Sequence, residues 1–219
     1  MNIKHLCFDL DGTLVDSSET IYKSTITTLQ RMDIKFGFSK NDLDKRIGKH
    51  FVDIFNEFDV KVPDFEHFIK IYKSIYFDFI DNSVLYPNVS EILEQLKNSD
   101  LKISLLTTKA QDQADLIINH FNLRPYFNLV MGRINEIPHK PAPEPLLLIC
   151  KSLGILPGET IMIGDTELDI QCGKNAGTKT CAVSYGYRTI EQLEEDKPDY
   201  LINSIWEIPG LVLAENSRK

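Results

Sequence analysis

Two aspartates, Asp9 and Asp11, follow the first apolar run of the chain, in the order Phe8-Asp9-Leu10-Asp11-Gly12. Because side chains alternate along an extended chain, both carboxylates can project toward the same side. Two like charges so close together are unfavourable unless a cation bridges them or one of them keeps its proton. The pair therefore indicates either an oxygen-ligated Mg²⁺ site or a carboxylate pair in which one attacks and the other moves a proton.

A second acidic pair, Asp165 and Asp169, follows the apolar run 161–163 and opens an expected helix that extends to about Ala176. We expect Asp165 at the tip of a strand and Asp169 on the first helical turn, pointing back toward it. Either aspartate could merely serve the helix N-terminus, where Asp is favoured. If both acidic pairs lie on neighbouring strand tips, three or four carboxylates meet in one crevice, and that charge requires a metal ion.

Hydroxyl and ammonium groups stand between these acidic pairs in the sequence. Thr107 and Thr108 follow the apolar run 103–106, and Lys140 lies in a loop stiffened by the prolines of Lys140-Pro141-Ala142-Pro143. A lysine taken alone is usually a solvated surface charge. Here the strand-end carboxylates need a compensating cation and an anionic substrate needs another, so we expect Lys140 to serve this site.

The elements that must position these residues alternate along the chain. Short β-favouring runs recur, with segments of helical periodicity between them, and this alternation predicts a parallel sheet with helices on both faces. The fold class is therefore α/β, a doubly wound parallel sheet. The expected strands are 3–8, 102–106, 129–131, 160–163, 180–183 and 200–202.

The segment 17–83 interrupts the alternation, because it shows helical periodicity and no convincing strand. We therefore predict a discontinuous α/β core, 1–16 with 84–219, and an inserted helical subdomain, 17–83. Within the insert, apolar residues at spacings of three and four form a stripe on one helix face, and such stripes normally build a core. The stripe consists of Phe65, Phe68, Ile69, Tyr72, Ile75, Tyr76 and Phe79.

Charge and composition exclude several classes of partner. The 219 residues include 24 Lys+Arg and 32 Asp+Glu, a formal net charge of −8, so neither nucleic acid nor an anionic membrane is an expected partner. No run approaches the roughly 18 apolar residues of a membrane span, and Asp9 comes too early for a signal peptide. The cysteines lie in apolar or helical segments without a CxxC pair, which indicates free thiols in the cytoplasm. They are Cys7, Cys150, Cys172 and Cys181.

In these motifs the chain resembles the haloacid dehalogenase-like superfamily of phosphotransferases with an aspartate nucleophile. Within it, the sequence is similar to phosphoglycolate-phosphatase-like members that carry a helical cap after the first motif, the C1 position. The four motifs occur in order: Asp9 to Asp16, then Thr107, then Lys140, then Gly164-Asp165 with Asp169. The full set, with an insert of the right length in the right place, is highly specific, and the resemblance covers nearly the whole chain.

The resemblance implies that Asp9 attacks the substrate phosphorus and becomes an aspartyl-phosphate. Asp11 would protonate the leaving oxygen and then take a proton from water. The implied Mg²⁺ ligands are the Asp9 side chain, the Asp11 backbone carbonyl and Asp165, with Asp169 in support through waters or Lys140. Lys140 would also keep the anionic nucleophile from repelling an anionic substrate.

For substrate binding, the resemblance implies that Thr107 and Lys140 hold the phosphoryl oxygens, with Thr108 beside them. Many relatives have Asn where Thr108 stands, so the contact on the leaving-group side differs here. Arg46 lies in the cap segment 45–50, which reaches over the active site in related phosphatases, and it could pair bidentately with a second anionic group. The alternative for Arg46 is a solvated charge at a helix end.

Three other activities compete with a phosphatase. A β-phosphoglucomutase-like phosphotransferase uses the same motifs, but those mutases have a histidine shortly after the first motif, and this chain has Ile21 near that place. An inorganic pyrophosphatase on the same scaffold stays open. A phosphoaspartate signalling switch would have no use for Asp11 or for the insert. We expect a Mg²⁺-dependent phosphatase, monomeric or homodimeric, that hydrolyses a small phosphorylated metabolite such as phosphoglycolate.

Overall fold

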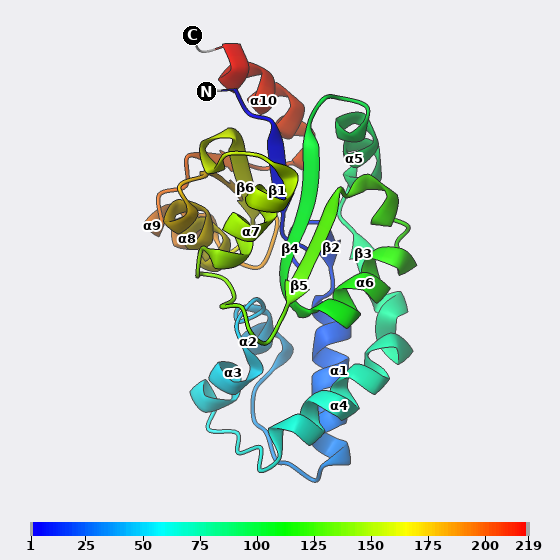
Figure 1. Ribbon diagram of the computed structural model, residues 1–219. Helices are drawn as coiled ribbons and strands as arrows, with labels where there is room; N and C mark the ends of the chain where they lie inside the picture. The colour runs from blue at the N-terminus through cyan, green and yellow to red at the C-terminus, as the bar shows by residue number, and fades with distance from the viewer. Residues whose placement is uncertain (1, 218–219) are drawn as a thin grey trace. The chain divides into compact units, whose positions relative to one another are not determined.

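The computed structural model describes residues 2–217 and divides the chain into two compact units. One unit combines the chain up to Leu14 with the chain from Leu85 onward, and the other is Val15–Val84. The first unit is an α/β structure and the second is helical (Figure 1). The two-residue strands β2 (Val15–Asp16) and β3 (Val84–Leu85), where the chain passes between the units, pair with each other.

The α/β unit is built on a six-stranded sheet in which every neighbouring pair of strands is parallel. The strand order is β5-β4-β1-β6-β7-β8. Its central strands are almost continuously apolar because helices cover both faces, which confirms the predicted α/β class. The strands are β1 (His5–Phe8), β4 (Lys102–Ala110), β5 (Leu129–Arg133), β6 (Thr160–Gly164), β7 (Lys179–Val183) and β8 (Tyr200–Ile202).

Helices follow the strands and enclose the sheet. The α-helices of this unit are α5 (Val89–Lys97), α6 (Gln111–His120), α7 (Glu144–Leu153), α8 (Glu167–Ala176), α9 (Ile190–Glu195) and α10 (Ile208–Ser217). Short 3₁₀ turns occur at η2 (Arg124–Tyr126), η3 (Pro157–Glu159) and η4 (Ile205–Glu207). Both α7 and α8 end at glycines with positive φ, Gly154 and Gly177, a conformation that only glycine adopts without strain.

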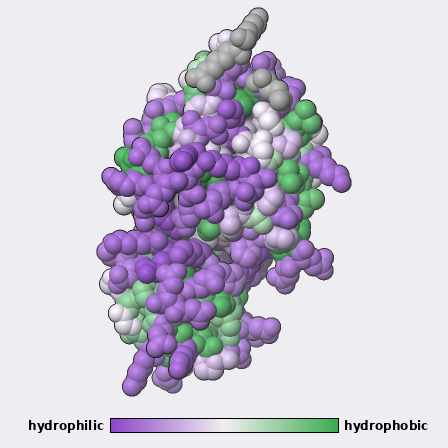
Figure 2. Space-filling model, turned by 90° about the vertical axis from the view of Figure 1, so that its left-hand side faces the viewer, coloured by the Kyte–Doolittle hydropathy of each residue, from purple (hydrophilic) through white to green (hydrophobic). Residues whose placement is uncertain are grey.

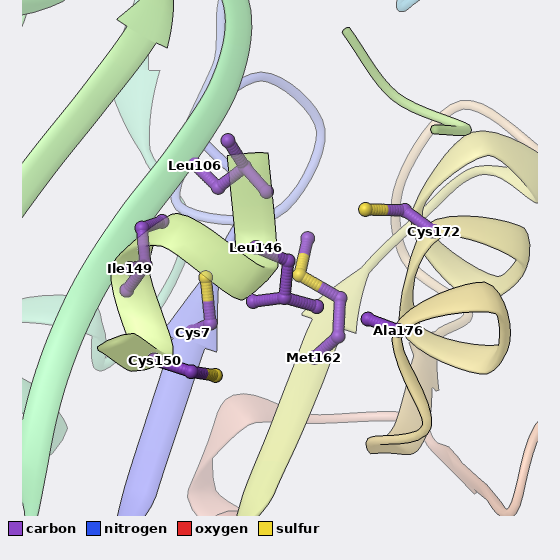
Figure 3. Close-up of a cluster of buried hydrophobic side chains, with 8 residues drawn as sticks. All are labelled: Cys7, Leu106, Leu146, Ile149, Cys150, Met162, Cys172 and Ala176. Carbon is purple, nitrogen blue, oxygen red and sulfur yellow. The ribbon is translucent and has the colours of Figure 1, made fainter. Parts of the chain in front are cut away.

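One buried cluster joins three adjacent strands to α7 and α8 (Figure 3). Each fully buried aliphatic side chain in it contributes roughly 1.5–3 kcal/mol to folding. All four cysteines of the chain are buried free thiols, as expected, and three of them belong to this cluster. The cluster consists of Cys7, Leu106, Leu146, Ile149, Cys150, Met162, Cys172 and Ala176.

A polar contact also crosses the centre of the sheet. The ring of His5 on β1 is fully buried and lies 2.8 Å from the Ser104 hydroxyl on β4 and 3.0 Å from the Thr160 hydroxyl on β6. Burial lowers the pKa of His5 to about 4. The imidazole is therefore neutral at pH 7 and links three strands by hydrogen bonds.

The helical unit contains α1 (Ser18–Arg31), α2 (Lys40–Asp44), α3 (Phe51–Glu57), α4 (Phe65–Tyr76) and the 3₁₀ segment η1 (Phe77–Asn82). The expected stripe lies on α4 and η1, and its residues Phe68, Tyr72, Ile75 and Tyr76 are buried. The Phe68 ring meets the Phe55 ring of α3 edge-on, with 5.0 Å between centroids. The stripe therefore builds the core of this unit.

Strand β4 is longer than predicted. It continues past residue 106 through Thr107 and Thr108 to Ala110, because β5 runs beside it, with Ala110 paired to Arg133 after a register shift. No helix within residues 2–217 combines the length and the hydrophobicity needed to cross a bilayer. The face shown in Figure 2 is mainly hydrophilic, with hydrophobic residues in small separate patches.

Candidate active site

Three strand ends meet at one edge of the sheet. Strand β1 lies between β4 and β6, and Phe8 is in register with both Leu105 and Ile163. Asp9 and Asp165, which follow β1 and β6, therefore lie at the same carboxyl edge of the sheet as Thr107, which is two residues past Leu105 within β4. The strand order reverses at β1, and this switch point is where open α/β sheets bind ligands.

The loop after β1 is held tightly against the sheet. The Asp9 amide donates to the Ile163 carbonyl at 2.9 Å, and the Leu14 amide donates to the Leu10 carbonyl at 2.9 Å. Gly12 has φ +86°, and a Cβ at this position would collide with the Asp165 carboxylate. Glycine is required here both by its conformation and by the close approach of that carboxylate.

Three buried carboxylates, those of Asp9, Asp165 and Asp169, form a cluster at this edge. Each offers an oxygen within 4.8 Å of the others. Asp165 accepts hydrogen bonds from the Thr13 hydroxyl at 3.1 Å and from the Tyr187 amide at 2.8 Å. These contacts leave little freedom for the Asp165 side chain, so the cluster has a fixed geometry.

Asp169 is fixed by the start of α8. One of its oxygens accepts from the Thr166 amide at 3.1 Å and from the Thr166 hydroxyl at 2.7 Å, an arrangement that caps the helix. The expectation that an aspartate here could serve the helix N-terminus is therefore correct for one oxygen. The other oxygen points at Lys140, so Asp169 serves the cap and the cluster together.

Lys140 bridges two of the carboxylates. Its ammonium lies 2.6 Å from an Asp9 oxygen and 2.5 Å from an Asp169 oxygen, and the residue is only 4% exposed. Such burial is tolerated only for a charge that is paired. Lys140 is therefore a member of the cluster and not a solvated surface charge.

Burial determines the ionisation of the cluster. It raises the pKa of Asp9 to about 7, although the charge of Lys140 opposes the shift. It also raises the pKa of Asp165 well above the usual range, with Asp9 and Asp169 adding to the effect. For Lys140, burial alone would lower the pKa, but the charges of Asp169 and Asp9 outweigh it and the pKa is raised. The site therefore has more carboxylates than its single bridging ammonium can balance.

Asp11 faces a second lysine. The ammonium of Lys109 lies 3.3 Å from an Asp11 oxygen, and both side chains are about 10% exposed. The Thr107 hydroxyl is buried and accepts from the Lys109 amide at 3.2 Å, while Thr108 is partly exposed. Lys109 was not among the predicted site residues, although its position two residues after Thr107 on one strand places both on the same face.

Arg46 is held within the helical unit. Its Nε donates to Glu57 at 2.6 Å, its Nη1 donates to the Asp42 carbonyl at 2.8 Å, and its guanidinium lies 4.3 Å from the centre of the Phe58 ring. Lys49 pairs with the same Glu57 at 2.8 Å. Arg46 is therefore a well-anchored side chain of this unit.

Several supporting residues were not recognised from the sequence. Thr13 and Tyr187 donate to Asp165, and Gly186 lies so close to Asp165 that a Cβ there would collide with it. Gly186 and Tyr187 are about twenty positions from the nearest motif, so only the fold brings them to the site. Thr13 was within the first motif and could have been selected as a donor from its hydroxyl.

The donor set of the cluster consists of oxygen atoms alone. Among residues 2–217, no histidine nitrogen or cysteine sulfur joins this group of ligand atoms. Hard divalent cations prefer such a set of carboxylate oxygens. The excess of carboxylates over the bridging ammonium points the same way, because a divalent cation would balance it. Asp9, Asp165 and Asp169 can therefore hold such a cation.

Comparisons of sequence agree with this geometry. Residues 6–183 match the family model of haloacid dehalogenase-like hydrolases. The chain is 35% identical over 207 residues to the pyrophosphatase PpaX of Bacillus mycoides, with 94% of each chain covered. It is 33% identical over 220 residues to the pyrophosphatase PpaX of Bacillus anthracis, with all of both chains covered.

Solved structures share the fold. A predicted phosphoglycolate phosphatase from Haemophilus somnus superposes with a TM-score of 0.86 at 26% identity, covering 96% of this chain and 98% of that one. A predicted phosphatase from Clostridium acetobutylicum gives 0.83 at 27% identity, covering 98% of this chain and all of that one. Since the family model covers most of the chain and these relatives nearly all of it, the chain belongs to the haloacid dehalogenase-like hydrolases and is a phosphatase of that family.

Proposed function

We propose that this phosphatase is Mg²⁺-dependent, uses Asp9 as its nucleophile and has inorganic pyrophosphate as its preferred substrate. The observation that carries the mechanism is the Lys140 ammonium, which lies between Asp9 and Asp169, two of the three clustered carboxylates. The choice of pyrophosphate is supported by the relatives named pyrophosphatase, which are 33–35% identical to this chain over nearly its whole length.

The chain's own residues divide the reaction between them. A carboxylate oxygen of Asp9 attacks phosphorus, the bond from phosphorus to the leaving oxygen breaks, and Asp11 gives that oxygen a proton. Water then attacks the phosphorus of the aspartyl-phosphate, Asp11 takes the water's proton, and Asp9 is released. The Asp9 and Asp165 side chains and the Asp11 carbonyl would hold Mg²⁺, with Asp169 in support, and the bound ion would supply the charge neutralisation that phosphoryl transfer needs.

The remaining polar groups bind substrate. Thr107 and Lys140 hold the phosphoryl oxygens, and Thr108 lies beside them. Lys140 keeps the incoming phosphate from being repelled by the carboxylates. The helical unit acts as a cap that selects the substrate, with Arg46 as its candidate anion-binding residue. The four buried free thiols support a reducing, cytoplasmic site of action.

Phosphate release from a panel of compounds tests the proposal. The panel contains pyrophosphate, phosphoglycolate, hexose phosphates and nucleotides, each with Mg²⁺ or with EDTA. We expect release that requires Mg²⁺, is fastest for pyrophosphate and is absent from the Asp9→Asn variant. Release that persists in EDTA or in Asp9→Asn would contradict the mechanism. Fastest release from another compound would contradict the proposal that pyrophosphate is the preferred substrate.

Phosphoglycolate is a second candidate substrate. It is favoured by the structural similarity to the Haemophilus somnus protein, whose name is predicted phosphoglycolate phosphatase. Both candidates carry a phosphoryl group next to a second anionic group. The same panel separates them by the ratio of kcat/KM for the two compounds.

A further inference from the structure

Arg133, the last residue of β5, is a partly buried cation without an ion pair or hydrogen bond among residues 2–217. Burial lowers the pKa of its guanidinium. A guanidinium that loses water without gaining an acceptor is unfavourable, because it carries five N–H donors. By contrast, Arg124 donates to the Phe127 carbonyl and Arg188 to both Glu167 oxygens. Arg133 therefore lacks an anionic partner among the described residues.

Arg133 lines a hollow that reaches the catalytic cluster through Lys140. Thr107 and Lys140 line the same hollow, whose enclosed part is small, about 10 Å³, room for about one water molecule. Most of its other walls are apolar side chains such as Met131. Lys140 connects it to the nucleophile, because its ammonium is 2.6 Å from Asp9. Arg133 thus lines the same hollow as two residues proposed to hold phosphoryl oxygens.

The position of Arg133 follows from the fold. Strand β5 lies at the edge of the sheet beside β4 (Figure 1), and Arg133 is in register with Ala110, three residues beyond Thr107. Gly132 before it approaches the backbone of Gln111 so closely that a Cβ would collide with it, and its amide donates to the Gln111 side chain at 2.7 Å. The backbone that carries Arg133 is therefore firmly anchored.

A second anionic group of the substrate would meet Arg133 at the open side of this hollow, because the enclosed part is too small to hold it. In a diphosphate a single bridging oxygen joins the two phosphoryl groups, so with one group on Thr107 and Lys140 the other lies in adjacent space. The planar fork of arginine matches phosphate and carboxylate oxygens in pairs, and apolar walls strengthen such contacts by excluding water. The cluster itself is rich in carboxylates, so a doubly charged substrate needs a further cation.

We propose that Arg133 is a specificity residue of the α/β unit that binds the second anionic group of the substrate. This deepens the proposed function and rests on it. The group is a phosphoryl group in pyrophosphate and a carboxylate in phosphoglycolate, and the chemistry of recognition is the same. Arg133 does not touch the reacting phosphorus, so its removal affects compounds with two anionic groups most.

The test compares Arg133→Met with Arg133→Lys and with Arg31→Met. The control Arg31 is an exposed arginine at the end of α1, so its substitution removes the same side chain from an unrelated place. We measure kcat/KM with Mg²⁺ for pyrophosphate, phosphoglycolate and p-nitrophenyl phosphate, which has no second anionic group. A binding titration with methylenediphosphonate, a diphosphate analogue that is not hydrolysed, provides a readout independent of turnover.

Arg133→Met is expected to lower kcat/KM for pyrophosphate, for phosphoglycolate or for both by about 30-fold or more, the effect of one charged bidentate contact. For p-nitrophenyl phosphate the loss is at most about threefold, because no second anionic group is present to lose its partner. Arg133→Lys falls between wild type and Arg133→Met, and Arg31→Met behaves as wild type. A loss of kcat/KM for pyrophosphate alone identifies the bound group as phosphoryl, and a loss for phosphoglycolate alone identifies it as carboxylate. A loss for both shows that Arg133 binds either group.

Equal losses on all three compounds, or no loss on any, would overturn the assignment of Arg133. If wild type released phosphate from none of the compounds, the proposed function would fail, and the titration would still judge Arg133. In that case, methylenediphosphonate binding weakened about 10-fold or more by Arg133→Met supports the anion site. Binding of equal strength in wild type and Arg133→Met rejects it.

Discussion

At the scale of single residues, Lys140 holds the charge balance of the active site. It is almost fully buried and touches both Asp9 and Asp169. A buried charge whose partner is removed cannot regain water, so the effect of breaking such a pair exceeds that of an exposed pair. The lysine therefore matters for folding as well as for chemistry.

Replacing Lys140 by Met in the metal-free protein at pH 8 should lower the free energy of unfolding by about 3 kcal/mol, because two buried carboxylates then face each other. The matched control is Lys179→Met. That lysine pairs with Asp199 at 3.1 Å with its side chain 43% exposed, and its loss should change the free energy by less than about 1 kcal/mol. Urea unfolding measures both values, and equal values would show that Lys140 is not a structural counter-charge.

Asp9→Asn should lower kcat for pyrophosphate by at least about 10⁴-fold, because an amide oxygen is a poor nucleophile toward phosphorus. The fold should persist, because Asn keeps the shape of the side chain in its buried position. Circular dichroism and urea unfolding check the fold, and phosphate release checks the rate. An Asp9→Asn protein with more than a hundredth of wild-type activity would remove the nucleophile assignment.

At the scale of elements, β1 is tied to its neighbours by polar as well as apolar contacts. The neutral ring of His5 joins the hydroxyls of Ser104 and Thr160 on both flanking strands. Because the ring is fully buried, it accepts a proton less readily while the strands are paired than after they separate. Strand pairing is therefore coupled to pH.

The pKa of His5 is about 4 in the folded chain, against 6.5 for an ordinary histidine. The unfolded chain therefore binds the proton more readily, and stability is fully present above pH 6.5 and falls as the pH drops toward 4. The loss attributable to His5 is about 3 kcal/mol across that interval. Denaturant midpoints between pH 7.5 and 4.5 should fall less steeply in His5→Gln than in wild type. His120→Gln, at an exposed position, should keep the wild-type slope.

Strands and motif positions were predictable from the sequence because apolar runs and aspartates after them are local signals. The extension of β4 to Ala110 was not, because pairing with Arg133 on a strand distant in the sequence causes it. Tyr187 and Gly186 could not be predicted either, because only the fold brings these residues, distant in the sequence, next to Asp165. Lys109 was missed although its alternation with Thr107 was visible in the sequence.

At the scale of the whole molecule, the chain forms two compact units from three stretches of sequence. The α/β unit alone contains Asp9, Asp11, Thr107, Lys140, Asp165 and Asp169, whereas Arg46 belongs to the helical unit. The sequence resemblance indicated that Arg46 lies in a segment that reaches over the active site. The internal contacts of Arg46 with Glu57 and Phe58 depend on helix packing and could not be derived from sequence spacing.

Mg²⁺ should stabilise the whole protein, because a ligand bound only by the folded state shifts the unfolding equilibrium. At 100 times the dissociation constant the gain is about 2.7 kcal/mol, a rise in Tm of roughly 5–10 °C. Asp165→Asn should remove most of this rise, whereas Asp100→Asn, at an exposed turn, should retain it. Thermal unfolding with Mg²⁺ or EDTA measures the difference. An undiminished rise in Asp165→Asn would place the ion elsewhere.

The burial of all four cysteines makes the chain suitable for site-specific labelling. Burial raises the pKa of the Cys172 thiol to about 12, and such a thiol reacts slowly with maleimides. Cysteines introduced at exposed positions, for example Asn56→Cys in the helical unit and Gln95→Cys in the α/β unit, would therefore react selectively. A fluorophore pair at these positions would follow the distance between the two units in real time as substrate and Mg²⁺ are added.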